Sequence, residues 1–196
     1  MVNYIVNKIV QDLTLDLPFV DKITGIVKTA KIKVADKVKT IPISVNTNVT
    51  TCNESELLDY VPNDNYTSII YFEDRGTTLQ KMENQSLYYQ SNFTLVCWFN
   101  YLKIDQTLTN TSQITGNLIK YLPEIMGNIT PLIGVVLSIT GQQANDGGVF
   151  SKYSYYEEIS QYITYPYGYV ALDLQAEYHV RKECILDITS NPATCL

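Results

Sequence analysis

The residues best suited to chemistry lie on one stretch of the chain, 169–181, which reads YVALDLQAEYHVR. Asp173, Glu177, His179 and Arg181 occupy alternate positions in this stretch. Alternate side chains of a β-strand leave the same face, so the two carboxylates would lie about 13 Å apart. The paired carboxylates of glycosidases lie within roughly 5 to 10 Å of each other. The spacing therefore disfavours a hydrolase, and we predict that the protein is not an enzyme and has no catalytic residues.

His179 is the one histidine of the chain, which excludes a two-histidine metal site within a single copy. Cys184 lies five residues further on, so a strand would place the two side chains on opposite faces. The cysteines, Cys52, Cys97, Cys184 and Cys195, lack C-x-x-C spacing, and we predict reduced packing residues rather than bridges or zinc ligands. The sequence also has no nucleophile elbow, Walker A loop or dinucleotide-binding glycine motif, so no metal or cofactor is predicted.

Two acidic pairs, Glu73-Asp74 and Glu157-Glu158, are further candidates for acid–base chemistry. Adjacent side chains on a strand or helix diverge, so neither pair converges on a common point. We predict that both lie on ordinary solvated faces.

The periodicity of apolar residues indicates the elements that position these groups. Even-numbered residues from Val170 to Val180 are apolar, which is typical of a strand with one buried face and one face in water. Predicted strands cover 28–34, 38–45, 68–74, 86–104, 135–143 and 169–181, and predicted helices cover 2–13, 54–61, 112–126 and 155–162. The fold class is therefore α+β: a single domain over 1–196, with an antiparallel sheet and flanking helices.

Three local features complete the predicted organisation. Residues 28–46 form a hairpin that projects as an arm, and Pro42 makes its second strand an edge strand or a bulged one. The Asn-Asp-Gly-Gly stretch at 145–148 predicts a turn, and the tail 187–196 has few anchors. Pro123 leaves open whether the helix over 112–126 ends early.

The charge is unevenly distributed along the chain. Residues 22–39 hold six lysines and one aspartate, whereas the other residues hold eight basic and nineteen acidic side chains. A protein that binds nucleic acid over its whole surface is disfavoured, because phosphate contacts need clustered positive charge. The basic segment itself leaves two interpretations open, contact with phosphate or docking on an acidic face of a sister subunit.

Tyrosine is abundant, with sixteen residues, and supplies rigid contact area with a polar tip. The cluster over 153–169 includes Tyr153, Tyr155 and Tyr156 and is a candidate contact surface. No apolar run approaches the ~18 residues of a membrane span, and no export signal is visible.

Three passages together resemble a known family: PFVDKITGIVKT at 18–29, SIIYFEDRG at 68–76 and TLVCWFNYLKI at 94–104. Their order and layout resemble a neck or tail ring (connector) protein of crAss-like phages of Bacteroides. The layout is also similar to the tail-terminator and tail-completion proteins of tailed phages.

The resemblance implies a structural virion protein without enzymatic activity, made in the host cytoplasm. Its copies would form a ring in the neck or tail, between the portal and adjacent rings, around a channel for genomic DNA that is not read by sequence. Under this hypothesis Asp173 and Glu177 face the channel. The subunit interface would include Lys28, Lys31, Lys33, Lys37, Lys39, Tyr153, Tyr155 and Tyr156. The alternative is a carbohydrate-binding or fibre-attachment module of a virion, in which tyrosines stack on sugars.

Overall fold

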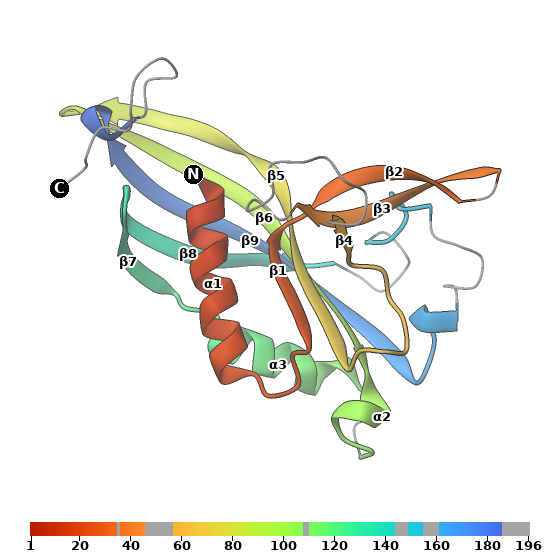
Figure 1. Cartoon of the computed structure of the whole chain (residues 1–196). Helices are drawn as coiled ribbons and strands as arrows, with labels where there is room; N and C mark the ends of the chain where they lie inside the picture. Colours follow the sequence, from red (N-terminus) through yellow and green to blue (C-terminus); the bar gives the residue numbers. More distant parts are fainter. Residues whose placement is uncertain (35, 46–56, 108–109, 144–148, 155–160, 186–196) are drawn as a thin grey trace.

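The computed structural model describes residues 1–34, 36–45, 57–107, 110–143, 149–154 and 161–185 (Figure 1). Its elements, in chain order, are α1 (Val2–Asp16), β1 (Lys22–Ile26), β2 (Lys28–Val34), β3 (Lys37–Val45), β4 (Leu57–Asp59), β5 (Ser68–Glu83), β6 (Ser86–Asn100), α2 (Tyr101–Ile104), α3 (Thr111–Tyr121), β7 (Ile125–Ile129), β8 (Leu132–Gln142), β9 (Tyr167–Arg181) and a 3-10 turn, Lys182–Cys184. More residues lie in strands than in helices, and the mixture of sheet and helices agrees with the predicted fold class.

A six-stranded sheet with the order β1-β5-β6-β9-β8-β7 forms the body of the protein. Five strands are joined by antiparallel pairing, as predicted, whereas β1 pairs with β5 in parallel. The strand β6 lies near the middle, and its residues from Phe93 to Asn100 are buried on both faces. Apolar side chains occur on both faces in this part of the sequence, which is typical of a central strand covered on both sides.

The helices α1 and α3 cover one face of this sheet, which we call the helix-covered face (Figure 1). Ile5, Ile9 and Leu13 of α1 are fully buried at helical spacing, which confirms the predicted amphipathic helix. The helix α3 begins at its N-cap Asn110, whose side chain accepts a hydrogen bond from Ser112 N at 3.1 Å. It ends at Tyr121, just before Pro123, so of the two alternatives left open for the helix over 112–126 the early end is the one observed.

The even-numbered residues of β9 from Val170 to Val180 are buried against these helices, as the alternation predicts. The odd-numbered residues of β9 lie on the opposite face of the sheet. Only part of this face is in water, because Tyr169 and Ala171 are buried. They belong to a second core around Trp98, which also contains Tyr60, Ile69, Tyr71, Val96, Val149, Phe150 and Tyr153.

Three predicted boundaries differ in the structure. The strand predicted over 68–74 does not end there: β5 continues to Glu83 through irregularities in its register with β6. The predicted strand over 86–104 ends at Asn100 and becomes α2, because the Asn100 side chain caps Leu102 N at 3.1 Å. Within the predicted helix over 54–61, Leu57–Asp59 form the strand β4 instead.

The strands β2 and β3 form a hairpin in continuous register from Lys28–Ile43 to Val34–Lys37, and Figure 1 shows it extending away from the six-stranded sheet. The register is continuous at Pro42, so the second arm is not bulged there. From Lys37 to Pro42 the arm has β2 as its one partner strand among the described residues, as the predicted edge strand requires. Pairing with β4 covers Ile43–Val45 only, and the Pro42 carbonyl accepts a hydrogen bond from Tyr60 N at 3.0 Å. Proline is tolerated here because only its acceptor is required.

Several predictions concern residues outside the described part of the chain. They are the turn at 145–148, most of the helix over 155–162, the tail 187–196, the pair Glu157-Glu158, Tyr155, Tyr156, Cys52 and Cys195. Cys97 and Cys184 are both free, as predicted. Cys97 is fully buried, and this burial raises the pKa of its thiol.

Gly168 occupies a position where a methyl group has no room. An added Cβ would lie 2.7 Å from Phe99 Cε2 and 2.9 Å from Tyr101 Oη. Replacing Gly168 with alanine is therefore expected to lower the free energy of unfolding by about 2 kcal/mol, measured by urea denaturation. Gly116 in α3 has open space around it, so Gly116→Ala should raise stability by about 0.5–1 kcal/mol. A Gly168→Ala variant as stable as Gly116→Ala would contradict this packing.

Candidate functional site

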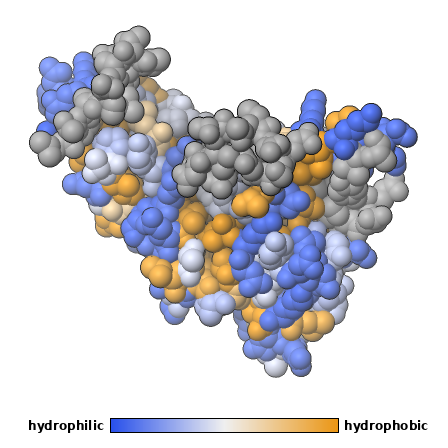
Figure 2. Space-filling model, in the orientation of Figure 1, coloured by the Kyte–Doolittle hydropathy of each residue, from blue (hydrophilic) through white to orange (hydrophobic). Residues whose placement is uncertain are grey.

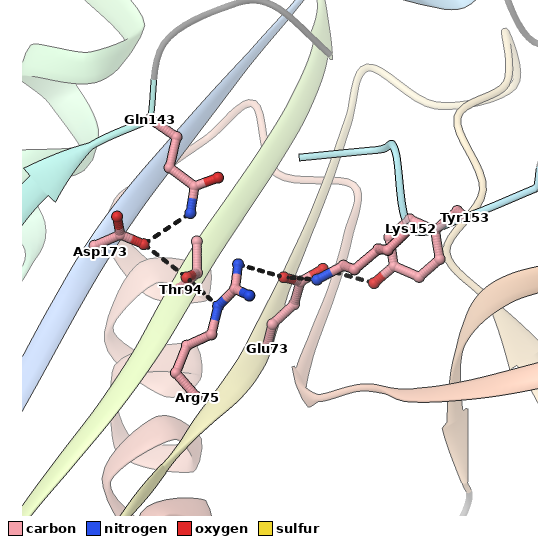
Figure 3. Close-up of polar contacts among 7 residues, drawn as sticks. All are labelled: Glu73, Arg75, Thr94, Gln143, Lys152, Tyr153 and Asp173. Carbon is pink, nitrogen blue, oxygen red and sulfur yellow. Dashed lines mark hydrogen bonds and ion pairs between the residues drawn. The ribbon is translucent and has the colours of Figure 1, made fainter. Parts of the chain in front are cut away.

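A polar network on the opposite face of the sheet is centred on Glu73, which is only 5% exposed (Figure 3). Tyr153 donates its hydroxyl to Glu73 Oε1 at 2.6 Å, and Lys152 forms an ion pair with Glu73 Oε2. Arg75 Nη2 lies 3.4 Å from the same carboxylate oxygen. One buried carboxylate therefore joins strand β5 to the segment 149–154.

The position of Arg75 follows from an irregularity in strand pairing. Asp74 pairs with Phe93 and Gly76 pairs with Asn92, so Arg75 is an extra residue on β5. Gly76 adopts φ +108°, a conformation that favours glycine, and Asp74 Oδ1 accepts a hydrogen bond from Gly76 N at 2.8 Å. Such a bulge re-aims a side chain, and here it brings the guanidinium alongside Glu73.

The network continues across the sheet through Thr94 of β6. Arg75 Nε donates to Thr94 Oγ1 at 3.0 Å, and Thr94 Oγ1 donates to Asp173 Oδ1 at 2.8 Å. Gln143, which follows β8, donates from Nε2 to the same Asp173 oxygen at 2.9 Å. Side chains of β5, β6 and β9 are thus linked to one another, to the segment 149–154 and to Gln143 (Figure 3).

This arrangement cross-links separate segments of the chain. Glu73 and Asp173 flank Thr94 across adjacent strands, but each carboxylate is occupied by donors from the protein itself. Three hollows on the described residues, of about 540, 440 and 590 Å³, are lined by other residues. No group of three or more potential metal ligands occurs among the described residues.

Sequence reasoning missed the role of Glu73, which is not on a solvated face as predicted. Ile69, Tyr71 and Glu73 alternate along one strand, and the first two are buried in the second core. This apolar alternation indicates that Glu73 projects into the same core. Its partners Lys152 and Tyr153 lie about eighty positions away, and no local pattern in the sequence connects them to it.

The candidate residues of β9 do not converge on one point. Asp173 is half-buried in the network, whereas Glu177 is exposed and accepts a hydrogen bond from Gln175 Nε2 at 3.1 Å. The ring of His179 stacks on Tyr88 with centroids 5.1 Å apart, and Lys81 Nζ lies 4.5 Å from the Tyr88 centroid. Both rings line the shallow hollow of about 540 Å³. Orientation of Asp173 or Glu177 toward a channel stays a prediction.

The tyrosines over 153–169 that the structure describes make mainly internal contacts. Tyr153 is 6% exposed and Tyr169 is 7% exposed, both within the second core. Tyr167 stacks on Trp98 with centroids 5.4 Å apart. Tyr165 is 67% exposed and stacks on Tyr101. Packing thus accounts for most of this cluster, and the ring of Tyr153 is not at the surface of the single chain.

The five lysines predicted at a subunit interface lie on both faces of the hairpin. The strand register places Lys28, Lys37 and Lys39 on one face and Lys31 and Lys33 on the other. A single flat surface therefore cannot contact all five.

Two edges of the six-stranded sheet lack a strand partner within the described residues. On one side, β1 pairs with β5 only at 69–72, so β5 beyond Phe72 has β6 as its one partner strand. Leu79 and Met82 on this edge are 50% and 60% exposed. On the other side, β7 is the last strand, and its Ile125 is 78% exposed.

A scan against protein-family models gives no match, and a search of the curated proteins gives no significant match. The fold is therefore characterised by its own features, a curled, mainly antiparallel sheet with helices on one face and a separate three-stranded hairpin sheet. Across the described residues, no helix combines the length and apolar character required to cross a membrane.

Proposed function

We propose that the protein is a structural subunit of a phage virion that assembles into a ring of the neck or tail by contacts between sheet edges. The observation that carries this proposal is the pair of open and dissimilar edges on opposite sides of one sheet. Cyclic rings need heterologous contacts, in which one surface of a subunit meets a different surface of the next. The edges β5 and β7 are two such surfaces.

The β5 edge can pair with an additional strand. Its residues from Asp74 to Glu83 are all exposed, and its backbone groups on the outer side have no strand partner among the described residues. A hollow of about 590 Å³ lies where β1 leaves the sheet, between the start of α1, Lys28 and Thr77. An incoming strand would continue the line of β1 at this point. Natural proteins cover or block such long edges, so a partner is expected here.

The β7 edge offers a complementary apolar surface. Ile125 is largely exposed, and Val136 and Ile139 on the adjacent strand are 44% and 41% exposed. Together with Ile119 they line a hollow of about 440 Å³ beside the end of α3. Leu79 and Met82 of a neighbouring subunit are suitable apolar groups to cover this surface.

The resemblance to connector and tail-terminator proteins supports the virion setting, with other rings or the portal as further partners. Glu177 is an exposed carboxylate on the opposite face of the sheet. In a ring, repulsion between such carboxylates and DNA phosphates would keep the passing genome from adhering to the channel.

Assembly is tested by introducing a charge on each edge separately. Leu79→Lys is expected to block the β5 edge and Ile125→Lys the β7 edge, because an edge lysine opposes strand addition. Light scattering after size exclusion should show rings for the wild type and monomers for each variant alone. Leu15→Lys, at a residue of α1 that is 83% exposed, is the matched control and should form rings.

Mixing the two edge variants distinguishes heterologous from isologous contacts. Each variant keeps one intact edge, so an equal mixture should form dimers that cannot grow further. Dimers of Ile125→Lys alone would indicate pairing of β5 with itself and would contradict a ring. A wild-type chain that stays monomeric at every concentration reached would also contradict the proposal.

A further inference from the structure

A shallow hollow of about 540 Å³ lies over the six-stranded sheet near the turn between β5 and β6. Its floor is formed by β6 at 88–90 and by β9 at 177–179, and its sides by Gln80 and Lys81 of β5 and by Gly134 and Val136 of β8. Volumes of roughly 300 to 1,000 Å³ are typical of sites for small ligands. Both floor strands have partner strands on either side, so they offer a peptide no open backbone to pair with. A ligand is therefore held here by side chains.

The aromatic faces beside the hollow already have partners. Strand register pairs Lys81 with Tyr88 and Tyr88 with His179, so the three side chains form a row across β5, β6 and β9. Lys81 Nζ lies 4.5 Å from the Tyr88 centroid, and the His179 ring stacks on Tyr88 with centroids 5.1 Å apart. Nucleobases bind to proteins by stacking on accessible ring faces. The row therefore disfavours a nucleotide and leaves ring edges and polar atoms for a ligand.

Amide groups form a second row beside the aromatic one. Gln80 Nε2 donates to Gln90 Oε1 at 3.2 Å, and Gln90 Nε2 donates to Gln175 Oε1 at 3.0 Å. Gln175 Nε2 donates in turn to Glu177 Oε1 at 3.1 Å. These bonds hold the side chains in place before a ligand arrives, which reduces the entropy that binding costs. Among the described residues no group donates to Gln80 Oε1 or to Glu177 Oε2, so both oxygens remain as acceptors.

The mixture of groups indicates the chemistry of the ligand. An anion is disfavoured by Glu177, and Lys81, the one cationic chain of the described lining besides the imidazole, is paired with Glu83 at 2.9 Å. An apolar ligand is disfavoured because Val136 is the one aliphatic side chain among the described residues of the lining. Figure 2 shows hydrophobic atoms in patches on the side of the molecule that it presents, and such patches suit an apolar partner better. A hydroxyl group both donates and accepts hydrogen bonds, as an amide does, so a neutral polyhydroxylated ligand suits the hollow.

We infer that this hollow binds a neutral saccharide of one or two sugar units, with Gln80, Gln90 and Glu177 hydrogen-bonded to its hydroxyl groups. Gly134 leaves room for the sugar beside the imidazole, since a Cβ there would lie 3.7 Å from His179 Cε1. A few net hydrogen bonds at an open site predict a Kd of about 1 mM. The site lies within one chain and does not require a ring, so the inference goes beyond the proposed function.

The test uses the one histidine of the chain, because the Cε1 proton of His179 gives a unique NMR signal at the site. The whole chain is titrated with four neutral disaccharides: lactose, maltose, cellobiose and N,N′-diacetylchitobiose. At least one of them is expected to shift this signal in a saturable way, with a Kd of about 1 mM. The indole N–H proton of Trp98, which is buried in the second core, should keep its position and serves as the internal reference.

The variant Gln80→Ala/Glu177→Ala removes two exposed groups from the hollow and keeps His179 as the probe. Each lost hydrogen bond weakens binding about fivefold, so the Kd should rise about 20-fold. The control Gln11→Ala/Asp16→Ala removes an amide and a carboxylate from exposed positions of α1, which covers the other face of the sheet. Its Kd should stay within about twofold of the wild type, because distant sites act independently. An unchanged Trp98 signal checks that each variant is folded.

Three outcomes would overturn the inference: no shift of the His179 signal by any of the four disaccharides, a shift that does not saturate, or the same Kd in the hollow variant and in the control. A shift caused by inorganic phosphate but by none of the disaccharides would assign the hollow to an anion instead. Saccharide binding by a chain that never forms rings would leave this inference standing and remove the proposed function. Rings without saccharide binding would do the reverse.

Discussion

Replacing Glu73 with alanine is expected to lower the free energy of unfolding by about 3 kcal/mol. The carboxylate is buried, and its removal leaves the Tyr153 hydroxyl and the Lys152 and Arg75 cations without their shared partner. Breaking a buried ion pair costs roughly 3–5 kcal/mol. The lower end applies because the Lys152 and Arg75 side chains are 37% and 44% exposed and can regain water. Urea denaturation followed by far-ultraviolet circular dichroism measures the change.

Glu83→Ala is the matched control for this prediction. Glu83 lies on the same strand and pairs with Lys81 at 2.9 Å, but its side chain is 54% exposed. A surface pair of this kind contributes about 0.5 kcal/mol or less. Equal losses in Glu73→Ala and Glu83→Ala would contradict a buried cross-link. Tyr153→Phe, combined with Glu73→Ala in a double-mutant cycle, isolates the hydroxyl contact, which should contribute about 1–2 kcal/mol.

Replacing Trp98 with alanine is expected to have the largest effect, a loss of about 4 kcal/mol. The indole is fully buried in the second core and stacks on Tyr167. Its Nε1 donates to Tyr162 O, which ties the segment before β9 to the middle of the sheet. Removal of the ring creates a large cavity and leaves a carbonyl without this donor. Because Trp98 is the one tryptophan, circular dichroism must replace fluorescence as the probe of unfolding.

Trp98→Phe separates packing from the hydrogen bond. Phenylalanine keeps much of the ring area but lacks the N–H, so a smaller loss of about 1–2 kcal/mol is expected. Limited proteolysis should cleave Trp98→Ala faster than Trp98→Phe near residues 161–167, because only alanine removes the ring contacts with Tyr162 and Tyr167. Equal stability of Trp98→Ala and the wild type would show that the second core does not hold this face of the sheet.

Local periodicity was sufficient to predict the elements whose apolar residues face one core. The spacing of Ile5, Ile9 and Leu13 defined α1, and the alternation from Val170 to Val180 defined the buried face of β9. In β6, apolar residues occur on both faces of the strand, a pattern typical of a central strand. These patterns suffice because burial on one side of a helix or strand leaves a regular signal in neighbouring residues.

Boundaries that depend on distant partners were predicted less well. The strand predicted over 68–74 stops short of Gly76, but pairing with β6 extends β5 through the bulge. A helix was predicted over 54–61, but pairing with β3 makes Leu57–Asp59 a strand. Tertiary pairing overrides weak local preference in both places.

The amino-acid sequence by itself determined which residues are buried along α1, β6 and β9, and that the hairpin is basic while the body is acidic. Only the tertiary structure decided that Glu73 joins Arg75, Lys152 and Tyr153, and that β5 and β7 are open edges. The physical reason is that these features depend on strand order and on the packing of the segment 149–154, which brings Lys152 and Tyr153 to Glu73 from about eighty positions away. The periodicity of apolar residues shows which face of an element is buried, but it does not specify which elements pack against that face.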